Sequence, residues 1–384
     1  MEVYLDHSAT TRCYREAADL MVRIMTEDYG NPSSMHRKGM EAENYLREAA
    51  SELAGILKVQ EKEIYFTSGG TESNNWALVG TAMANRRRGN RILVSAVEHA
   101  AVSAPARWLA DQGFDVVVLP VDRFGVVKME ALEEALTPET ILVSVMHVNN
   151  EIGSVEPVEE IGNLIRKKAP GAYFHVDAIQ AFGKYRIYPR RMHIDMLSAS
   201  GHKIHGPKGI GLFYVNEKVK IHPLILGGGQ QNGMRSGTDN VPGAAGMALA
   251  AKMAYEHLEE KTARMRAMRD RLADGLSRIE RVVFHGMPSG QGAPHILNAS
   301  FLGIRSEVLL HALEDKGIYV SAGSACSSHK RAGSAVLTAI GCSREEMESA
   351  VRFSLGEETR EEEIDYTLDV LKALVPVLRR YIRH

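Results

Sequence analysis

The stretch ILVSVM, at residues 141–146, is apolar at almost every position. Strands that are covered on both faces of a sheet are apolar at consecutive rather than alternate positions. Similar runs recur on both sides of this stretch, with amphipathic helical patterns between most of them, which is typical of crossover units. We therefore predict an α/β fold with a mostly parallel sheet, whose strands lie at residues 63–67, 91–95, 115–120, 141–146, 172–176, 195–199 and 211–215.

After residue 215 the alternation of strand and helix patterns becomes weaker. A long helical stretch from about 243 to 279 leads into a weaker alternation of strand and helix patterns, and no internal repeat or low-complexity linker intervenes. We predict a large domain at residues 14–250 and a smaller, tightly joined α+β domain at residues 251–384. Residues 1–13 are expected to pack near the smaller domain.

Composition narrows the range of functions. A formal net charge of −2, from 46 basic and 48 acidic residues, argues against nucleic-acid binding. The start of the chain, MEVYLDHSATT, lacks the pattern of a secretion signal, and no apolar stretch is long enough to span a membrane, so we expect a cytoplasmic protein. Cys13, Cys326 and Cys342 lie far apart, which argues against disulfides and structural metal sites.

Polar residues follow five of the predicted strands, and ligands of parallel sheets gather at this edge. SGGTES follows 63–67, and His99 follows 91–95. Asn149 and Asn150 follow 141–146; Asp177 and Gln180 follow 172–176; SGHK follows 195–199. Each feature alone has a structural alternative, such as a tight turn or a buried core histidine. Five adjacent strand ends of this kind favour a ligand site.

Pyridoxal phosphate would use all five strand ends, because it needs a lysine amine, a carboxylate at the ring nitrogen, a phosphate cradle and a flat group over the ring. We assign Lys203 as the Schiff-base lysine. The alternative is that it is a turn residue without a functional role. Asp177 pairs with the ring nitrogen, and His99 stacks on the ring. The other predicted contacts are Gly70, Thr71, Ser200 and His202 to the phosphate, and Asn150 and Gln180 to the phenolic oxygen.

A second candidate feature lies near the end of the chain, in YVSAGSACSSHKRAGS at residues 319–334. Cys326 has small and polar neighbours, followed by a histidine and two cationic residues that favour its thiolate, so we predict a reactive cysteine. Cys13 and Cys342 fit structural roles better. Arg352, in the strand pattern AVRFSLG, suits either capture of a substrate carboxylate or an interdomain salt bridge.

Ten motifs also carry a family resemblance. In chain order they are YLDHSATT, YGNPSS, FTSGGTESNN, VEHAAV, MHVNNEIG, HVDAIQ, SGHKIHGPKGIG, GGGQQNGMRSGT, SAGSACSS and VRFSLG. They resemble the motifs of the NifS-like cysteine desulfurases of group I, which are fold type I pyridoxal phosphate enzymes. The resemblance runs essentially from Tyr4 to the last helix. It implies that sulfur is removed from L-cysteine to give L-alanine and a persulfide on Cys326.

The resemblance implies further roles and partners. Lys203, Cys326 and His99 would be catalytic, and Asn31 and Arg352 would hold the substrate carboxylate. Thr238 would reach the phosphate of the neighbouring subunit in a homodimer. An iron–sulfur scaffold protein or another acceptor, such as the tRNA thiolation system, would receive the sulfur. The alternatives are a selenocysteine lyase or an aminotransferase, or a non-catalytic sulfur carrier or regulatory binder on the same scaffold.

Overall fold

A computed structural model describes residues 1–288, 290–322 and 333–381. Within this part of the chain, the largest sheet has seven strands in the order β2-β8-β7-β6-β5-β3-β4. Every strand is parallel to the others except β8, which is antiparallel to both of its neighbours. The predicted α/β fold with a mostly parallel sheet is confirmed. The strands are β2 (Ile64–Thr67), β3 (Arg91–Ser95), β4 (Asp115–Leu119), β5 (Thr140–Met146), β6 (Tyr173–Asp177), β7 (Met196–Ser200) and β8 (Gly211–Val215).

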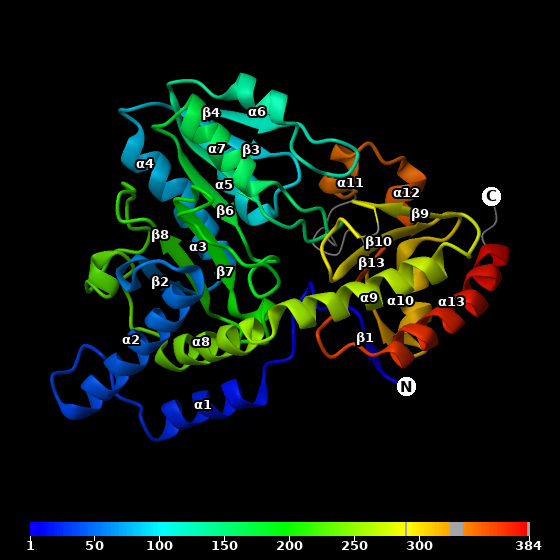
Figure 1. Cartoon of the computed structure of the whole chain (residues 1–384), viewed down its shortest axis with the longest axis horizontal. Helices are drawn as coiled ribbons and strands as arrows, with labels where there is room; N and C mark the ends of the chain where they lie inside the picture. Colours follow the sequence, from blue (N-terminus) through cyan, green and yellow to red (C-terminus); the bar gives the residue numbers. More distant parts are fainter. Residues whose placement is uncertain (289, 323–332, 382–384) are drawn as a thin grey trace.

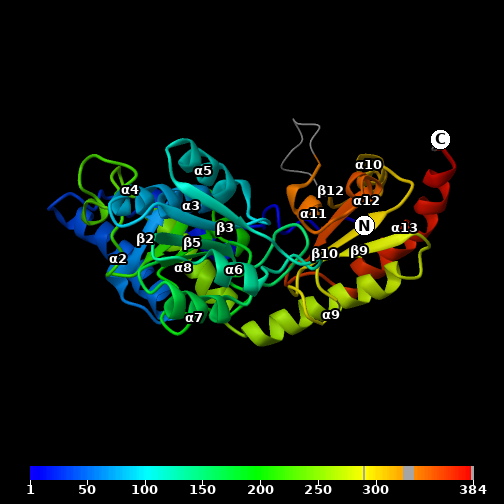
Figure 2. The same cartoon turned by 90° about the horizontal axis from the view of Figure 1, so that it is seen from above.

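Helices cover both faces of this sheet, as the continuous apolar strands require. Strand β5 is buried along its whole length. One apolar core joins the sheet to the π-helical segment η2, α4 and α5, and α3 lies against β7 and β8 on the same face. A second core joins the sheet to α2, α6, α7 and α8 on the other face (Figure 2). The helices are α2 (Arg37–Leu57), α3 (Gly70–Asn75), η2 (Trp76–Gly80), α4 (Thr81–Asn85), α5 (Ala100–Asp111), α6 (Met129–Ala135), α7 (Val158–Lys168) and α8 (Val241–Tyr255).

The strand order corrects one expectation. The five strand ends are not all adjacent, because β8 lies between β2 and β7. Antiparallel β8 begins at the edge where its neighbours end, and it begins with Gly211. A Cβ atom there would lie 2.7 Å from Cα of Gly69, so the glycine allows the β2 end to stay close to the other strand ends.

The predicted long helix at 243–279 is two helices. Helix α8 ends at Tyr255, and α9 (Leu258–Leu276) begins after His257, whose φ of 54° interrupts the helical path. The break coincides with a change in surroundings, since α8 is apolar and buried on nearly all sides whereas α9 is rich in charged residues. Helix α9 then runs along the second part of the molecule (Figure 1).

The second part contains an antiparallel sheet in the order β12-β13-β10-β9, and the pair β1–β11 is parallel. It has its own apolar core, which includes Phe301 and Phe353. The domain boundary predicted near residue 250 stays a prediction. The elements here are β1 (Val3–Tyr4), β9 (Val282–His285), β10 (Ile296–Phe301), β11 (Ile318–Tyr319), β12 (Ser321–Ala322), β13 (Ala350–Ser354), α10 (Ser306–Glu314), α11 (Ala335–Ala339), α12 (Arg344–Ser349) and α13 (Glu361–Tyr381).

The remaining elements are short or lie at the periphery. Helix α1 packs on α8, and the 3-10 turns are each three residues long. In the described part of the chain, none of the helices has both the length and the apolar composition to cross a membrane. These elements are α1 (Arg15–Thr26), η1 (Glu61–Glu63), η3 (Gly201–Lys203) and η4 (Gln231–Gly233).

Candidate active site

The turn between β2 and α3 lies at the carboxyl edge of the large sheet. Gly69 has a φ of 151°, which favours glycine. A Cβ atom at Gly70 would lie 2.1 Å from Cδ1 of Ile179, so a larger residue here would require the Ile179 side chain to move. Thr71 follows and is exposed. The turn therefore presents backbone amides and a hydroxyl group, which are the donors that bind phosphate.

Asp177 ends β6 as a buried carboxylate that is 2% exposed. Asn74 Nδ2 donates to Oδ2 at 2.7 Å, and the Ile179 amide donates to Oδ1 at 3.0 Å. Burial raises the pKa of Asp177, and the two donors and the nearby Lys203 and His99 oppose that rise. A buried carboxylate in this setting favours a cationic partner, such as a protonated ring nitrogen.

Lys203 lies on η3, immediately after β7. Its Nζ donates to the main-chain carbonyls of Ser8, at 2.5 Å, and Ala9, at 2.8 Å. These two residues come from the N-terminal segment, which the sequence predicted only to pack near the smaller domain. The segment that follows β1 therefore forms part of the site.

His99 and Gln180 flank the lysine and the aspartate. His99 caps the first turn of α5, where its Nδ1 accepts a hydrogen bond from the Ala101 amide at 3.0 Å. Gln180 is buried, and its Nε2 donates to the Ser8 carbonyl at 3.1 Å. Both side chains are thus held by hydrogen bonds to the main chain.

These side chains line one cavity of about 390 Å³. Such a volume suits a small-molecule ligand. Arg352 and Ser321, from the second part of the molecule, also line it. The predicted cofactor residues that line it are Gly70, Thr71, His99, Asn150, Asp177, Gln180, Ser200, His202 and Lys203.

Arg352 projects from β13 and is 7% exposed. Its Nη2 lies 2.8 Å from Oδ1 of Asp6, and its Nη1 donates to the Asn150 carbonyl at 3.0 Å. Its Nε has no hydrogen-bond partner within the described residues. The guanidinium thus lines the cavity, as carboxylate capture requires. It also links the second part of the molecule to the loop after β5, as expected for the alternative of an interdomain contact.

Two predicted residues do not line the cavity in this single chain. Asn31 is exposed, and its Oδ1 accepts from the Ser33 amide at 3.0 Å. Thr238 is also exposed. The role of Thr238 was expected across a subunit interface, and both roles stay predictions. Cys326 lies outside the described residues.

The other two cysteines have unreactive surroundings. Cys342 Sγ lies 3.3 Å from Nδ1 of His285, and burial raises the pKa of the thiol to about 11. Burial also raises the pKa of Cys13. Both thiols therefore stay protonated at neutral pH, which fits the structural roles expected for them.

The sequence reasoning missed several residues that hold the site together. Asn74 supports Asp177, and Asp6 pairs with Arg352. Asn74 could have been found, because it lies three residues after Thr71 on the same helical face. Asp6 and the carbonyls of Ser8 and Ala9 gave no usable signal, since nothing in the sequence places the N-terminal segment beside Lys203.

The chemistry of the cavity fits pyridoxal phosphate. A phosphate-binding turn, a lysine amine, a buried carboxylate and an imidazole share one space of suitable size. Among the residues that the structure describes, no group of three or more His, Cys, Asp or Glu side chains could hold a metal ion.

Residues 3–367 match the protein family described as Aminotransferase class-V. Over 377 residues the chain is 43% identical to a protein named Cysteine desulfurase IscS from Methanosarcina thermophila, covering 98% of this chain and 93% of that protein. A solved structure named NIFS-LIKE PROTEIN has a TM-score of 0.93 and 39% identity, with coverage of 98% and 100%. An apo cysteine desulfurase from Thermococcus onnurineus has a TM-score of 0.88 and 25% identity, with coverage of 98% and 95%.

Proposed function

The chain belongs to the class-V aminotransferase family and, within it, to the NifS-like cysteine desulfurases, and on that premise we propose that it is a pyridoxal phosphate-dependent cysteine desulfurase. It converts L-cysteine to L-alanine and retains the sulfur as a persulfide on Cys326. The observation that carries this proposal is the shared cavity, in which Lys203, Asp177 and His99 lie with a phosphate-binding turn.

The residues of the cavity divide the work of holding the cofactor. Lys203 would attach it covalently through Nζ, and the turn at Gly70 and Thr71 would bind its phosphate. His99 would cover the ring, and Asp177 would hold a proton on the ring nitrogen. When bound, the cofactor supplies an electron sink for the pair released from the substrate Cα–H bond.

Lys203 would also move a proton. As a free amine, its Nζ could take the α-proton of L-cysteine and later return a proton to the carbon product. The Ser8 and Ala9 carbonyls, at 2.5 and 2.8 Å, accept hydrogen bonds from Nζ and so keep the amine beside the cavity. Arg352 would bind the substrate carboxylate, and Asn31 would assist it.

Cys326 completes the reaction as the sulfur acceptor. Its thiolate forms a bond to the substrate sulfur while the carbon–sulfur bond of the substrate breaks. L-Cysteine and an enzyme thiol give L-alanine and an enzyme persulfide, so the atoms and electrons balance without an external oxidant. We place this chemistry in the cytoplasm, where the persulfide passes its sulfur to an iron–sulfur scaffold protein or another acceptor, such as the tRNA thiolation system.

Treatment of the purified protein with L-cysteine tests the proposal. We expect alanine release, together with one added sulfur on the Cys326 peptide by mass spectrometry. Cys326→Ser should lose the sulfur adduct and most alanine release, and the matched control Cys342→Ser should keep both. Undiminished alanine and sulfide release by Cys326→Ser would favour a selenocysteine lyase-like or aminotransferase-like activity instead. Absence of any alanine from the wild type would favour a non-catalytic carrier.

We also propose that the active enzyme is a homodimer with shared sites. Support comes from the exposure of Thr238 and from its segment, where Arg235 pairs with Glu72 at 2.9 Å beside the phosphate-binding turn. Sedimentation should give a dimer. A mixed dimer of one Lys203→Ala chain and one Thr238→Val chain tests this arrangement. If Thr238 serves the neighbouring subunit, the site of the Lys203→Ala chain carries both defects and the other site carries neither. That hybrid should then keep about half of the wild-type activity, and a hybrid with no activity would contradict this arrangement.

A further inference from the structure

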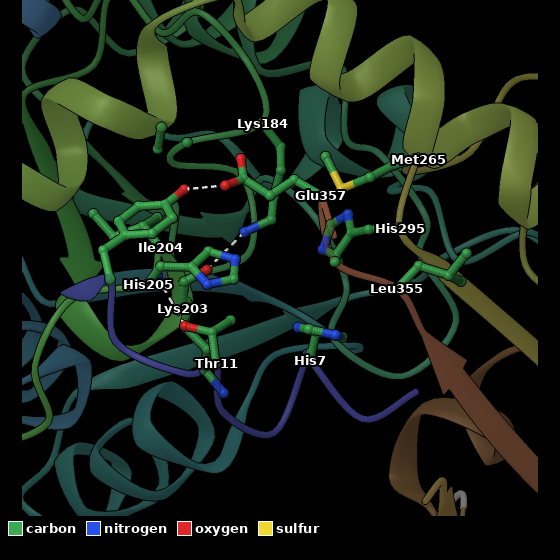
Figure 3. Close-up of a pocket in the computed structure, with 14 residues that line it drawn as sticks. His7, Thr11, Lys184, Lys203, Ile204, His205, Met265, His295, Leu355 and Glu357 are labelled. Atoms are coloured by element: carbon green, nitrogen blue, oxygen red, sulfur yellow. Dashed lines mark hydrogen bonds between the residues drawn. The ribbon is translucent and has the colours of Figure 1, made fainter. Parts of the chain in front are cut away.

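A second group of ionisable side chains lies against Lys203, and the reaction proposed above does not use it. We call it the Lys184 cluster; Figure 3 shows its members converging from separate segments of the chain. They surround a cavity of about 20 Å³, which has room for no more than a water molecule. The cluster therefore has no room for a substrate of its own. Its members are His7, Tyr14, Lys184, His205, His295 and Glu357.

Lys184 makes the direct contact with the catalytic lysine. Its Nζ donates to the main-chain carbonyl of Lys203 at 2.8 Å (Figure 3). Lys184 follows Gly183, whose φ of 78° lets the chain turn after β6 and direct the next side chain back toward η3. The ammonium of Lys184 is thus tied to the peptide unit that carries the proposed base.

The imidazoles around Lys184 add little charge at neutral pH. Burial lowers the pKa of His7 to about 4 and the pKa of His295 well below its ordinary value. Burial also lowers the pKa of His205, although Glu357 opposes that shift. All three rings are therefore mainly neutral, and the charged members of the cluster are Lys184 and Glu357.

Glu357 is already engaged by other partners. Its Oε1 accepts a hydrogen bond from the Tyr14 hydroxyl at 2.5 Å, and its Oε2 lies 3.1 Å from Nζ of Lys261. Burial alone would raise the pKa of Glu357, but these contacts hold it below its ordinary value. The carboxylate of Glu357 also raises the pKa of Lys184, but burial and the charge of Lys203 outweigh it, so Glu357 offsets the ammonium of Lys184 only in part.

The two lysines repel each other when both are charged. Burial and the charge of Lys203 together lower the pKa of Lys184 to about 8. A repulsion of this kind acts equally on both partners. Lys203 is also faced by Asp177 on β6 and by His202 on its own turn, and His99 and Arg352 line the same cavity. The carboxylate of Asp177 favours a charged amine, and Lys184 acts against it.

We propose that Lys184 is a positioning residue for Lys203: its ammonium fixes the main chain of the turn and disfavours a positive charge on the neighbouring amine, so that this amine is ready to accept a proton. This proposal rests on the proposed function, because Lys203 accepts a proton only in that reaction. The state of the Lys203 amine can nevertheless be measured in the full-length protein without cofactor or catalysis.

Trace acetylation of the cofactor-free protein over a range of pH gives this measurement. Mass spectrometry of the Lys203 peptide, normalised to exposed Lys167, reports the fraction of neutral amine. In Lys184→Met the labelling midpoint should move to higher pH by at least about half a unit, a roughly threefold change in the ratio of charged to neutral amine. Lys184→Arg keeps the positive charge and should have the same midpoint as the wild type. The control Lys208→Met, which removes an exposed cation five residues after Lys203, should leave it unchanged.

A second variant separates the charge from the hydrogen bond. Lys184→Gln keeps a donor for the Lys203 carbonyl without the charge, and we expect its midpoint to move as in Lys184→Met. An unchanged midpoint in Lys184→Gln would overturn the proposal, even if Lys184→Met failed to fold. A wild-type protein without desulfurase activity would instead contradict the proposed function. The labelling midpoints would remain valid in that case.

Discussion

The active-site cavity and the Lys184 cluster share Lys203 as a common wall, yet they are built differently. The cavity has room for a cofactor, and most of its polar groups follow the ends of neighbouring strands. The cluster encloses about 20 Å³, and its polar groups contact one another and the main chain. The active-site cavity is thus shaped to bind a ligand. The Lys184 cluster instead holds Lys203, the residue that would attach the cofactor.

Because of this difference, the two regions should respond differently to mutation. Loss of a side chain from the cavity removes a contact with the cofactor or substrate, so chemistry should suffer while the fold survives. Loss of a side chain from the cluster removes a contact within the protein, so stability or the state of Lys203 should change first. Each prediction below tests that division.

Asp177→Asn should have the largest effect. Asparagine cannot hold a proton on the ring nitrogen by charge, and we expect alanine formation to fall by about 100-fold or more. Because burial of the carboxylate is unfavourable, the free energy of unfolding should stay the same or rise. Alanine assays at saturating cofactor and thermal unfolding measure the two quantities. A variant that keeps its activity would remove Asp177 from the mechanism.

Asn74→Ala should have an intermediate effect that depends on pH. Asn74 donates to Asp177 at 2.7 Å, and this bond opposes the rise in the pKa of the buried carboxylate. Its loss should raise that pKa further, so a higher pH is needed to ionise Asp177. The acid limb of the activity profile should move upward by about one unit.

The neighbouring Asn75 provides a matched control for this shift. Its side chain donates to the Thr71 carbonyl at 2.9 Å rather than to Asp177. Asn75→Ala should therefore leave the acid limb where it is in the wild type. Equal shifts in both variants would mean that the helix as a whole, rather than the contact with Asp177, sets the profile.

Tyr14→Phe should have the smallest effect, and on stability alone. It removes the hydrogen bond to Glu357 in the cluster, which should lower the free energy of unfolding by about 1–2 kcal/mol. Since the pKa of Glu357 lies below its ordinary value in the folded state, this contribution is present above the ordinary glutamate range and is lost as the pH falls through the folded pKa. Denaturant titrations at two pH values measure the change.

Tyr45→Phe is the matched control for the cluster. Tyr45 donates to Asp28 at 2.7 Å in a pair away from Lys203. Because Tyr14 is more deeply buried than Tyr45, Tyr14→Phe should lower the free energy of unfolding more than Tyr45→Phe does. Attachment of cofactor to Lys203 should be unchanged in both, and a loss of attachment in Tyr14→Phe would break the division between the two regions.

The same division explains what the sequence could predict. Lys203, Asp177 and His99 follow strands whose apolar runs are easy to recognise, and the edge of a parallel sheet brings such residues together. The antiparallel insertion of β8 was missed, because periodicity gives no strand direction. Lys184 and His295 were missed because their meeting depends on how loops from the two sheets pack, and local patterns do not encode that packing.

Borohydride reduction of the holoprotein, followed by peptide mapping, would identify the lysine that carries the cofactor. We expect a pyridoxyl adduct on Lys203 and none on the nearby Lys184, whose ammonium donates to the Lys203 carbonyl. Lys203→Ala should give no adduct in this region. A wild-type protein that yields no adduct on Lys203, or carries it on Lys184, would contradict the account.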